Sequence, residues 1–526
     1  PHRRTGAEKV KSGSRSVKSL LPRTMLAAAA ATAVLFLLLF AIVQWSCRIS
    51  ERGAVFSAAG TGKGAGGRVI LLLADRLTYT DLLGGAGPNL DRVLEQGAAA
   101  LMNVRSGRAG SESGYLSLGA AARAVAGPEG RNAFGGGELI EGERAAVVFK
   151  RCTGTDPTGA LFHLQTAALQ EKNSVLPYPV QVGLLGERLG ERGLTAAVWG
   201  NADAAVPNRS AVLVAMNAAG EVRCGDMGSD LLLKAPLYPY GVRTDVEKLA
   251  STVAANLTGA ELHLVEFGDS SRLDEYWPQL NPDRGAALLG QTVRNLDLLL
   301  GRLLSIMEKN DLLLLVVPSL PQNRPAGGDQ LAPAALVAGS GSFPAGLLGS
   351  GSTRRPGLIQ NTDLAPLVLF LLDGGATGRP VLPAFTIVPE ENPRVFLEQF
   401  NRRAGLVFEQ RPLLLKPYIA ILVLVLLASL AGLSLKIRSS LQPACYLIGA
   451  LLLVPPALLL LPALLPYPSA AALPSGLTLC GAALLLALLL QPLVGREEPL
   501  YWAVLGWGIT LLLLLDTLTG APLQQL

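Results

Sequence analysis

Charged residues are scarce in this chain of 526 residues, at 16% of the total, whereas a soluble globular protein has about 25%. Half of the residues are hydrophobic, which excludes a disordered or collagen-like chain and disfavours an entirely soluble one. Aromatic residues make up only 5%, so the apolar content is mainly Leu, Ala and Val. The formal net charge is only +5, which argues against a nucleic-acid partner. A Walker A loop, a dinucleotide-binding fingerprint and a Cys-x-x-Cys pair are all missing, so no nucleotide or thiol-redox site is indicated.

The N-terminal segment combines a basic tail with a long apolar run. Residues 1–24 hold seven Lys or Arg residues and one acid, and residues 25–45 hold no charge. A run of this length can cross a hydrocarbon core of about 30 Å, and it is longer than the apolar core of a cleaved signal peptide. We therefore expect a transmembrane anchor at 25–46 rather than a cleaved signal. Basic residues favour the cytoplasmic side, so the tail should be inside and the following chain outside.

The C-terminal region, 412–526, is apolar again. Four further transmembrane helices are predicted near 417–435, 444–465, 476–494 and 500–519. If successive helices cross the membrane in opposite directions, the loops that carry Lys436, Arg438 and Arg496 lie inside. Basic residues favour that side. The sequence therefore predicts a multi-pass protein of the cell membrane, with the lipid bilayer as a partner and the central region extracytoplasmic.

The central region has an ordinary soluble composition. A Gly-rich linker at 47–67 leads into one domain at 68–411, which is predicted to be α/β with a doubly wound, mostly parallel sheet. Strands are expected at 68–74, 146–149, 194–199, 262–267, 312–317, 334–338 and 385–388. Helices are expected between them at 88–97, 180–192, 244–257 and 283–308. Cys152 and Cys224 lie in this domain, and their spacing leaves a disulfide and two free thiols both open.

Polar residues follow three of the expected strands. Asp75 ends the first, Asp269 follows the strand at 262–267, and Ser319 follows the strand at 312–317. Ligands of open α/β sheets bind at the carboxyl ends of strands, where two carboxylates would suit a divalent cation. The alternative is that each Asp caps a turn or the next helix.

The stretch 88–124 carries a more specific pattern. It contains Pro-Asn-Leu-Asp in a helix and then Ser-Glu-Ser-Gly-Tyr-Leu-Ser-Leu-Gly-Ala-Ala from Ser111. This resembles the nucleophile segment of cofactor-independent phosphoglycerate mutase, in the alkaline phosphatase superfamily, where the pattern is Ser-Glu-x-Gly-His-Leu-x-Ile-Gly-Ala-Gly. The resemblance covers most of 68–372. It implies that Ser111 has the nucleophile position and that Asp75 and Asp269 have metal-ligand positions.

Departures from that family concern its histidine ligands. The chain has three histidines: His2, His163 and His263. We expect His2 on the cytoplasmic side and the other two in structural positions. Where the family has His four residues after the later Asp, this sequence has Leu273.

The remaining ligand set is acidic. The family's Asp-His-Gly motif is replaced by Pro318-Ser319-Leu320, and its last His position aligns with Asp329. Asp75, Asp269 and Asp329 could hold one Mg²⁺ or Ca²⁺ with waters, but a two-zinc site needs His or Cys ligands.

Three functions remain open on this basis. The first is a catalytically degenerate alkaline phosphatase-like domain that acts as a binding or scaffold module. The second is an active, metal-dependent phosphatase or phosphotransferase that uses Ser111 on a phosphate ester of the cell envelope. The third is an accessory domain of a transporter-like membrane protein. The first two imply a phosphate-containing envelope ligand, and the sequence indicates no particular protein partner.

Overall fold

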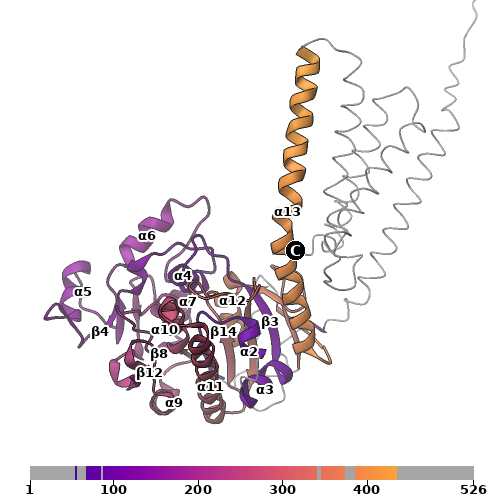
Figure 1. Cartoon of the computed structure of the whole chain (residues 1–526). Helices are drawn as coiled ribbons and strands as arrows, with labels where there is room; N and C mark the ends of the chain where they lie inside the picture. Colours follow the sequence, from indigo (N-terminus) through magenta and orange to yellow (C-terminus); the bar gives the residue numbers. More distant parts are fainter. Residues whose placement is uncertain (1–53, 56–66, 84–86, 340–344, 374–384, 435–526) are drawn as a thin grey trace, which may run out of the picture. The chain divides into compact units, whose positions relative to one another are not determined.

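The computed structural model describes residues 54–55, 67–83, 87–339, 345–373 and 385–434 (Figure 1). One compact unit runs from Arg52 to Pro412, and the described residues from Leu413 to Ser434 belong to a second unit. Both units share helix α13 (Pro393–Ser434). The candidate site lies entirely in the compact unit.

A single large sheet forms the centre of the compact unit (Figure 1). Its eleven described strands run in the order β1-β18-β16-β3-β15-β14-β2-β13-β8-β10, and β17 also pairs with β3. Strands β15 and β18 run antiparallel to both of their neighbours, and the other described pairs of this sheet are parallel, so most strands point the same way. The strand bounds are β1 Ala54–Val55, β2 Val69–Leu73, β3 Ala98–Asn103, β8 Ala196–Gly200, β10 Cys224–Asp226, β13 Leu262–Glu266, β14 Leu312–Val316, β15 Ala332–Ala338, β16 Gly346–Ser350, β17 Leu358–Gln360 and β18 Phe385–Val388.

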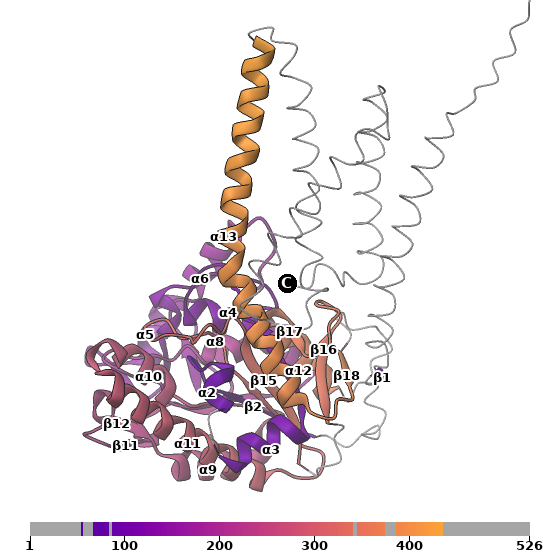
Figure 2. The same cartoon turned by 45° about the vertical axis from the view of Figure 1, so that its right-hand side comes forward.

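Helices cover both faces of this sheet (Figures 1 and 2). Strand β2 is apolar on both faces of the sheet, because Leu71 and Leu73 belong to one hydrophobic cluster while Ile70 and Leu72 belong to the other. The first cluster includes α4 (Ser111–Ala120), α7 (Leu184–Glu191), α8 (Val212–Ala215) and α12 (Leu364–Leu372). The second includes α2 (Tyr79–Leu83), α3 (Pro88–Gln96), α9 (Val246–Ala255) and α11 (Pro282–Ile306). The predicted α/β fold, with a mostly parallel sheet covered on both faces, is confirmed.

Smaller elements complete the compact unit. They are α5 Ala145–Thr153, α6 Thr166–Ser174, α10 Asp269–Tyr276, a three-stranded sheet of β4 (Ala133–Gly135), β7 (Leu161–His163) and β9 (Glu221–Val222), and the strand pairs β5 (Leu139–Ile140) with β6 (Glu143–Arg144) and β11 (Leu232–Lys234) with β12 (Val242–Thr244). One predicted strand is not observed, and one central strand was not predicted. The strand predicted at 146–149 is wrong, because it lies in α5, where Ala145 and Phe149 are buried at helical spacing. Strand β3 was not predicted, since its Ala-rich sequence has little intrinsic preference for a strand and is held by its neighbours.

The transmembrane predictions fall mainly outside the described residues. This holds for 25–46, 444–465, 476–494 and 500–519, and for most of the linker at 47–67, while 417–435 overlaps the end of α13. Within the part of the chain that the structure describes, no helix has the length and apolar character needed to cross a membrane. These segments stay predictions.

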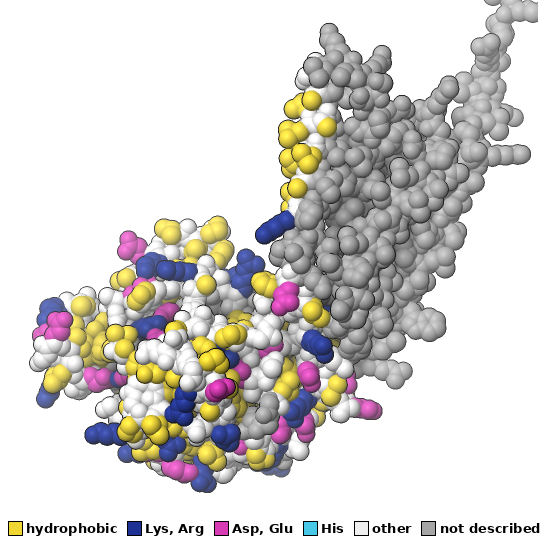
Figure 3. Space-filling view, in the orientation of Figure 1, with side chains coloured by type: hydrophobic (Ala, Val, Ile, Leu, Met, Phe, Trp, Pro, Cys, Tyr) yellow, Lys and Arg dark blue, Asp and Glu magenta, His cyan; other side chains and the backbone are white. Residues whose placement is uncertain are grey.

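Charges of both signs are mixed on the face of the compact unit shown in Figure 3. Lys and Arg side chains lie among Asp and Glu side chains there instead of gathering in one basic region. Exposed ion pairs of the compact unit include Arg151 with Glu143 and Arg302 with Glu247. This face therefore offers no continuous basic surface of the kind that follows a nucleic-acid backbone.

Candidate functional site

Three neighbouring strands bring the predicted site residues to one edge of the sheet. Strands β14, β2 and β13 are adjacent and parallel, with Val316, Leu73 and Glu266 at the same level. The chain leaves each strand at its carboxyl end, which is the usual place for a ligand site in such sheets. Asp75, Asp269 and Ser319 follow these three strands within three residues.

Asp75, Ser111 and Ser319 form one hydrogen-bonded group, here called the serine–aspartate cluster. Ser111 Oγ donates to Asp75 Oδ2 and lies 3.1 Å from Ser319 Oγ. Ser319 donates to Asp75 Oδ1 from both its backbone N, at 2.8 Å, and its Oγ, at 2.7 Å. All three side chains are buried. Burial raises the pKa of Asp75, against the opposing effects of Arg76 and of the two serines.

Helix α4 places Ser111 at its first residue, after Gly110, which has a φ of 144°. The helix lies very close to the segment after β14, because a Cβ on Gly114 would be 2.7 Å from the carbonyl oxygen of Pro318. This contact explains why glycine stands at this point of the nucleophile-like segment, and it brings Ser319 within reach of Ser111.

Arg76 adds a cation to the cluster. Its φ is 64°, an uncommon left-handed conformation for arginine, and only 8% of its surface is exposed. Its Nε lies 3.5 Å from Asp75 Oδ2, its Nη1 lies 3.8 Å from Asp274 Oδ2, and Nη1 also donates to the Leu320 carbonyl at 3.2 Å. A guanidinium group therefore balances part of the negative charge beside Ser111.

Asp269 begins α10 but makes different contacts. Its Oδ1 accepts hydrogen bonds from the backbone N of Thr244 at 2.7 Å, from Thr244 Oγ1 at 2.9 Å and from Arg272 Nη2 at 2.6 Å. Its Oδ2 is buried without a partner among the described residues. Leu273, where the resemblance expected a histidine, is buried. Arg272 thus supplies the positive charge next to this carboxylate.

Asp329 is held by a third set of donors. It accepts from Thr80 N at 2.9 Å, from Thr80 Oγ1 at 3.0 Å and from Asn401 Nδ2 at 2.6 Å. None of these bonds involves Asp75 or Asp269. Asp329 ties α2 to α13 and takes no part in the serine–aspartate cluster.

The acids predicted as metal ligands therefore do not form one group. Asp75, Asp269 and Asp329 each accept bonds from a separate set of protein donors, and no three His, Cys, Asp or Glu side chains of the described residues are placed to hold an ion. The expected three-carboxylate site for one Mg²⁺ or Ca²⁺ stays a prediction. Protein donors bond to Asp75, to Asp329 and to one oxygen of Asp269, while Asp269 Oδ2 has no partner among the described residues.

The two described histidines are buried in strands. His263 lies in β13, where its Nε2 is 3.0 Å from the Ala260 carbonyl and its Nδ1 accepts from Trp199 Nε1 at 3.2 Å. His163 is buried in β7, and burial lowers its pKa to about 4.

Sequence reasoning missed one buried acid, Glu266, at the end of β13. Its Oε1 accepts a 2.9 Å hydrogen bond from Tyr115 of α4, and its Oε2 has no partner among the described residues. Burial is the main cause that raises its pKa to about 8, so the side chain is mostly protonated at neutral pH. A signal was present, because a glutamate closes a strand that is predicted to be buried. Tyr115 stands where the family's segment has His.

No family model matches the sequence, and no curated protein matches it. Among solved structures, the chain is similar to the alkaline phosphatase of the Antarctic bacterium TAB5, with 12% identity over 58% of this chain and 98% of that one, and a TM-score of 0.33. It is similar to the phosphoglycerol transferase GacH of Streptococcus pyogenes, at 12% identity over 67% and 82% of the two chains, with a TM-score of 0.32. It is also similar to the lipoteichoic acid synthase LtaP of Listeria monocytogenes, at 13% identity over 61% and 76%, with a TM-score of 0.34. TM-scores this low carry no argument about activity.

Proposed function

We propose that the compact unit is a cell-envelope domain that binds a phosphate-containing ligand at the serine–aspartate cluster and does not turn it over with metal ions. One observation carries this proposal. Ser111 keeps its place at the start of α4, while Asp269 and Asp329 are bonded to Arg272, Thr80 and Asn401 instead of to a shared ion. The likeness to cofactor-independent phosphoglycerate mutase supports the proposal only through the Ser111 segment.

The same edge has donors suited to an anion. The first N–H groups of a helix have no partner within it, and α4 starts at Ser111 beside the Arg76 guanidinium. A phosphate oxygen could accept from these groups and from Ser111 Oγ. We expect binding without metal-dependent turnover, because the described acids bond to protein donors and form no ligand set for metal ions that would activate the serine and stabilise the leaving oxygen.

The experiment compares binding with turnover on the purified full chain. Calorimetry should detect glycerol phosphate or inorganic phosphate, with affinity at least ten-fold weaker in Ser111→Ala and Arg76→Ala. An aryl phosphate should not be hydrolysed measurably. Ser174→Ala is the matched control, because Ser174 is exposed on α6 and should leave binding unchanged. Failure of both phosphates to bind would refute the proposal.

A second candidate function is a metal-independent phosphotransferase. The observation in its favour is the direct contact of Ser111 Oγ with an aspartate whose pKa is raised. Asp75 would accept the Oγ proton while the Oγ–phosphorus bond forms and the ester bond breaks, and would then give that proton to the departing alkoxide. A water or alcohol would next attack the phosphoryl group on Ser111, with its proton passing to Asp75 and then back to Ser111 Oγ as the Oγ–phosphorus bond breaks. Phosphate release that survives a chelator and disappears in both Ser111→Ala and Asp75→Asn would favour this function over binding alone.

We also propose that the compact unit lies on the outer side of the cell membrane. The distribution of Lys and Arg around the predicted spans supports this topology. Cys152 offers a direct test, because its thiol is free and exposed. A membrane-impermeant maleimide should label intact cells, and Cys152→Ser should remove most of this labelling. Labelling of Cys152 only after lysis would reverse the topology.

A further inference from the structure

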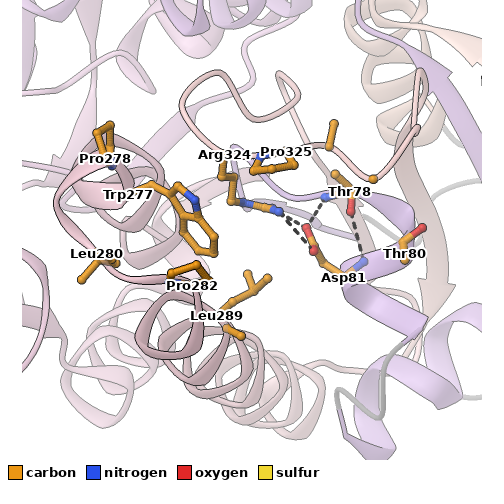
Figure 4. A pocket seen from close by; sticks show the side chains of 13 residues that line it. Thr78, Thr80, Asp81, Trp277, Pro278, Leu280, Pro282, Leu289, Arg324 and Pro325 are labelled. Carbon is orange, nitrogen blue, oxygen red and sulfur yellow. Dashed lines mark hydrogen bonds and ion pairs between the residues drawn. The ribbon is translucent and has the colours of Figure 1, made fainter. Parts of the chain in front are cut away.

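A pocket of about 490 Å³ opens in the compact unit next to the candidate site (Figure 4). Most of its wall is apolar, formed by Trp277, Leu280, Leu289 and several prolines. Figure 4 shows the Trp277 indole on one side and the paired side chains of Asp81 and Arg324 on the other. The pocket is in the size range of small-molecule sites. It is called the Trp277 pocket below.

The same three chain segments build both the candidate site and the Trp277 pocket. Each segment leaves a strand, contributes one residue to the sheet edge, and contributes a second residue to the pocket a few positions later. In order along the chain, the pairs are Asp75 and Asp81, Asp269 and Trp277, and Ser319 and Arg324. Arg324 joins the two regions directly, because its Nη2 donates at 2.8 Å to the carbonyl oxygen of Arg76. A ligand held at the cluster could therefore extend into the pocket.

Local contacts fix the tryptophan in this position. A Cβ on Gly285, in the first turn of α11, would lie 2.8 Å from the Trp277 ring, so the ring rests on a surface that only glycine provides. Pro278 and Pro282 both follow it and restrict the backbone on its C-terminal side. The indole ring thus presents an apolar surface in a fixed position at the edge of the pocket.

The polar side of the pocket has no net charge. Arg324 pairs with both carboxylate oxygens of Asp81, and the two side chains are only 4% and 9% exposed. Asp81 also accepts from Thr78 N at 2.7 Å. A wholly apolar ligand would cover this ion pair and remove its remaining water, which is costly. A free anion or cation would gain little from a pair that is already neutral.

We propose that the Trp277 pocket binds a neutral hydroxylated ring, such as a sugar. One face of such a ring carries C–H groups that pack on the indole, while its hydroxyl groups can donate to Asp81 and accept from Arg324. This inference rests on the proposed function, since the ring would be the part of an envelope phosphate ester that follows the phosphate. Pocket and cluster can nevertheless be tested separately.

The test measures binding of neutral hexoses and N-acetylhexosamines to the purified full chain by saturation-transfer NMR, with cyclohexane carboxamide as an apolar ring probe. Ala286→Trp should abolish sugar binding, because Ala286 lines the pocket and is exposed, so a larger side chain fills the space. Ala287→Trp is the matched control, since Ala287 is also exposed on α11 but does not line the pocket. Trp277→Ala should weaken sugar binding at least ten-fold.

The inference is supported if the wild-type chain and Ala287→Trp bind the sugar and Ala286→Trp does not. Three results would overturn it: binding of the apolar ring alone, no sugar binding at millimolar concentrations, or sugar binding that persists in Ala286→Trp. If sugars bind here but neither phosphate nor glycerol phosphate binds at the cluster, the proposed function fails while the pocket assignment stands. If the phosphates bind and sugars do not, only this inference fails.

Discussion

Arg272 Nη2 donates a 2.6 Å hydrogen bond to Asp269 Oδ1, and both side chains are at least 95% buried. The same guanidinium donates to the Asn201 carbonyl at 2.9 Å and to Thr244 Oγ1 at 3.0 Å. Arg272 therefore connects the end of β12 with the segments that follow β8 and β13, in addition to neutralising the aspartate. An internal cation stands beside a carboxylate that the sequence suggested as a metal ligand.

Arg272→Met should lower the free energy of unfolding by about 3–5 kcal/mol, because it leaves Asp269 buried without its counter-charge. Urea unfolding of the full chain measures this change. Arg302→Met is the control, since Arg302 pairs with Glu247 at 2.7 Å but both side chains are more than half exposed. That change should cost less than about 1 kcal/mol. Equal losses in the two variants would contradict a structural role for the Arg272 pair.

Chelators and added divalent metals should leave the melting temperature of the compact unit unchanged. A ligand that binds only the folded state raises stability in proportion to the logarithm of its concentration, so a metal site would be visible as a rise in Tm. No rise is expected, because Asp75 and Asp329 already accept bonds from protein donors. Differential scanning calorimetry with EDTA, Mg²⁺, Ca²⁺, Mn²⁺ and Zn²⁺ checks this. A metal-dependent rise that disappears in Asp75→Asn would show that these acids do bind an ion.

Glu266 should make the protein less stable as the pH rises from about 4.5 to about 8. Its pKa is raised in the folded state, so between these values the folded protein holds a proton that the unfolded chain has lost. The stability from this proton is complete below the unfolded pKa and is lost as the pH approaches the folded one, at up to about 1.4 kcal/mol per pH unit.

Glu266→Gln should remove this slope, because glutamine is neutral at every pH and can still accept from Tyr115. Urea midpoints measured from pH 4 to pH 9 compare it with the wild-type chain. The exposed Glu391 provides the control, and Glu391→Gln should keep the wild-type slope. A slope that is the same in Glu266→Gln and in the wild type would exclude Glu266 as its source.

Gly114→Ala should destabilise the compact unit by about 1–3 kcal/mol, because the new methyl group overlaps the Pro318 carbonyl and pushes α4 from the segment carrying Ser319. Phosphate binding at the cluster should weaken with it. Gly190→Ala, at an exposed helical position with open space around it, should instead stabilise by up to about 1 kcal/mol. Thermal unfolding of both variants decides whether close packing or helix propensity determines the change in stability when alanine replaces Gly114.

Several parts of this fold could be predicted from sequence because their signals are local. Strands β2 and β14 are short apolar runs buried on both sides, and β13 is a buried run rich in Leu and Val. Asn281 and Pro282 at the start of α11 are a common start of a helix. The positions of Asp75 and Asp269 after their strands followed from the same patterns, whereas Ser111 was indicated by the resemblance of its segment. The roles of these residues in chemistry stay predictions.

Tertiary structure alone decided which groups contact each other at the site. Asn401 reaches Asp329 across 72 residues, Ser319 reaches Asp75 across 244, and Tyr115 reaches Glu266 across 151. A carboxylate that follows a strand looks the same in sequence whether a metal ion or an arginine neutralises it. Its charge state and partners depend on burial and on donors brought from distant segments, which no local pattern records. The sequence by itself therefore determined the layers of the domain and the edge where its polar residues gather, and the folded chain determined how their charges are balanced.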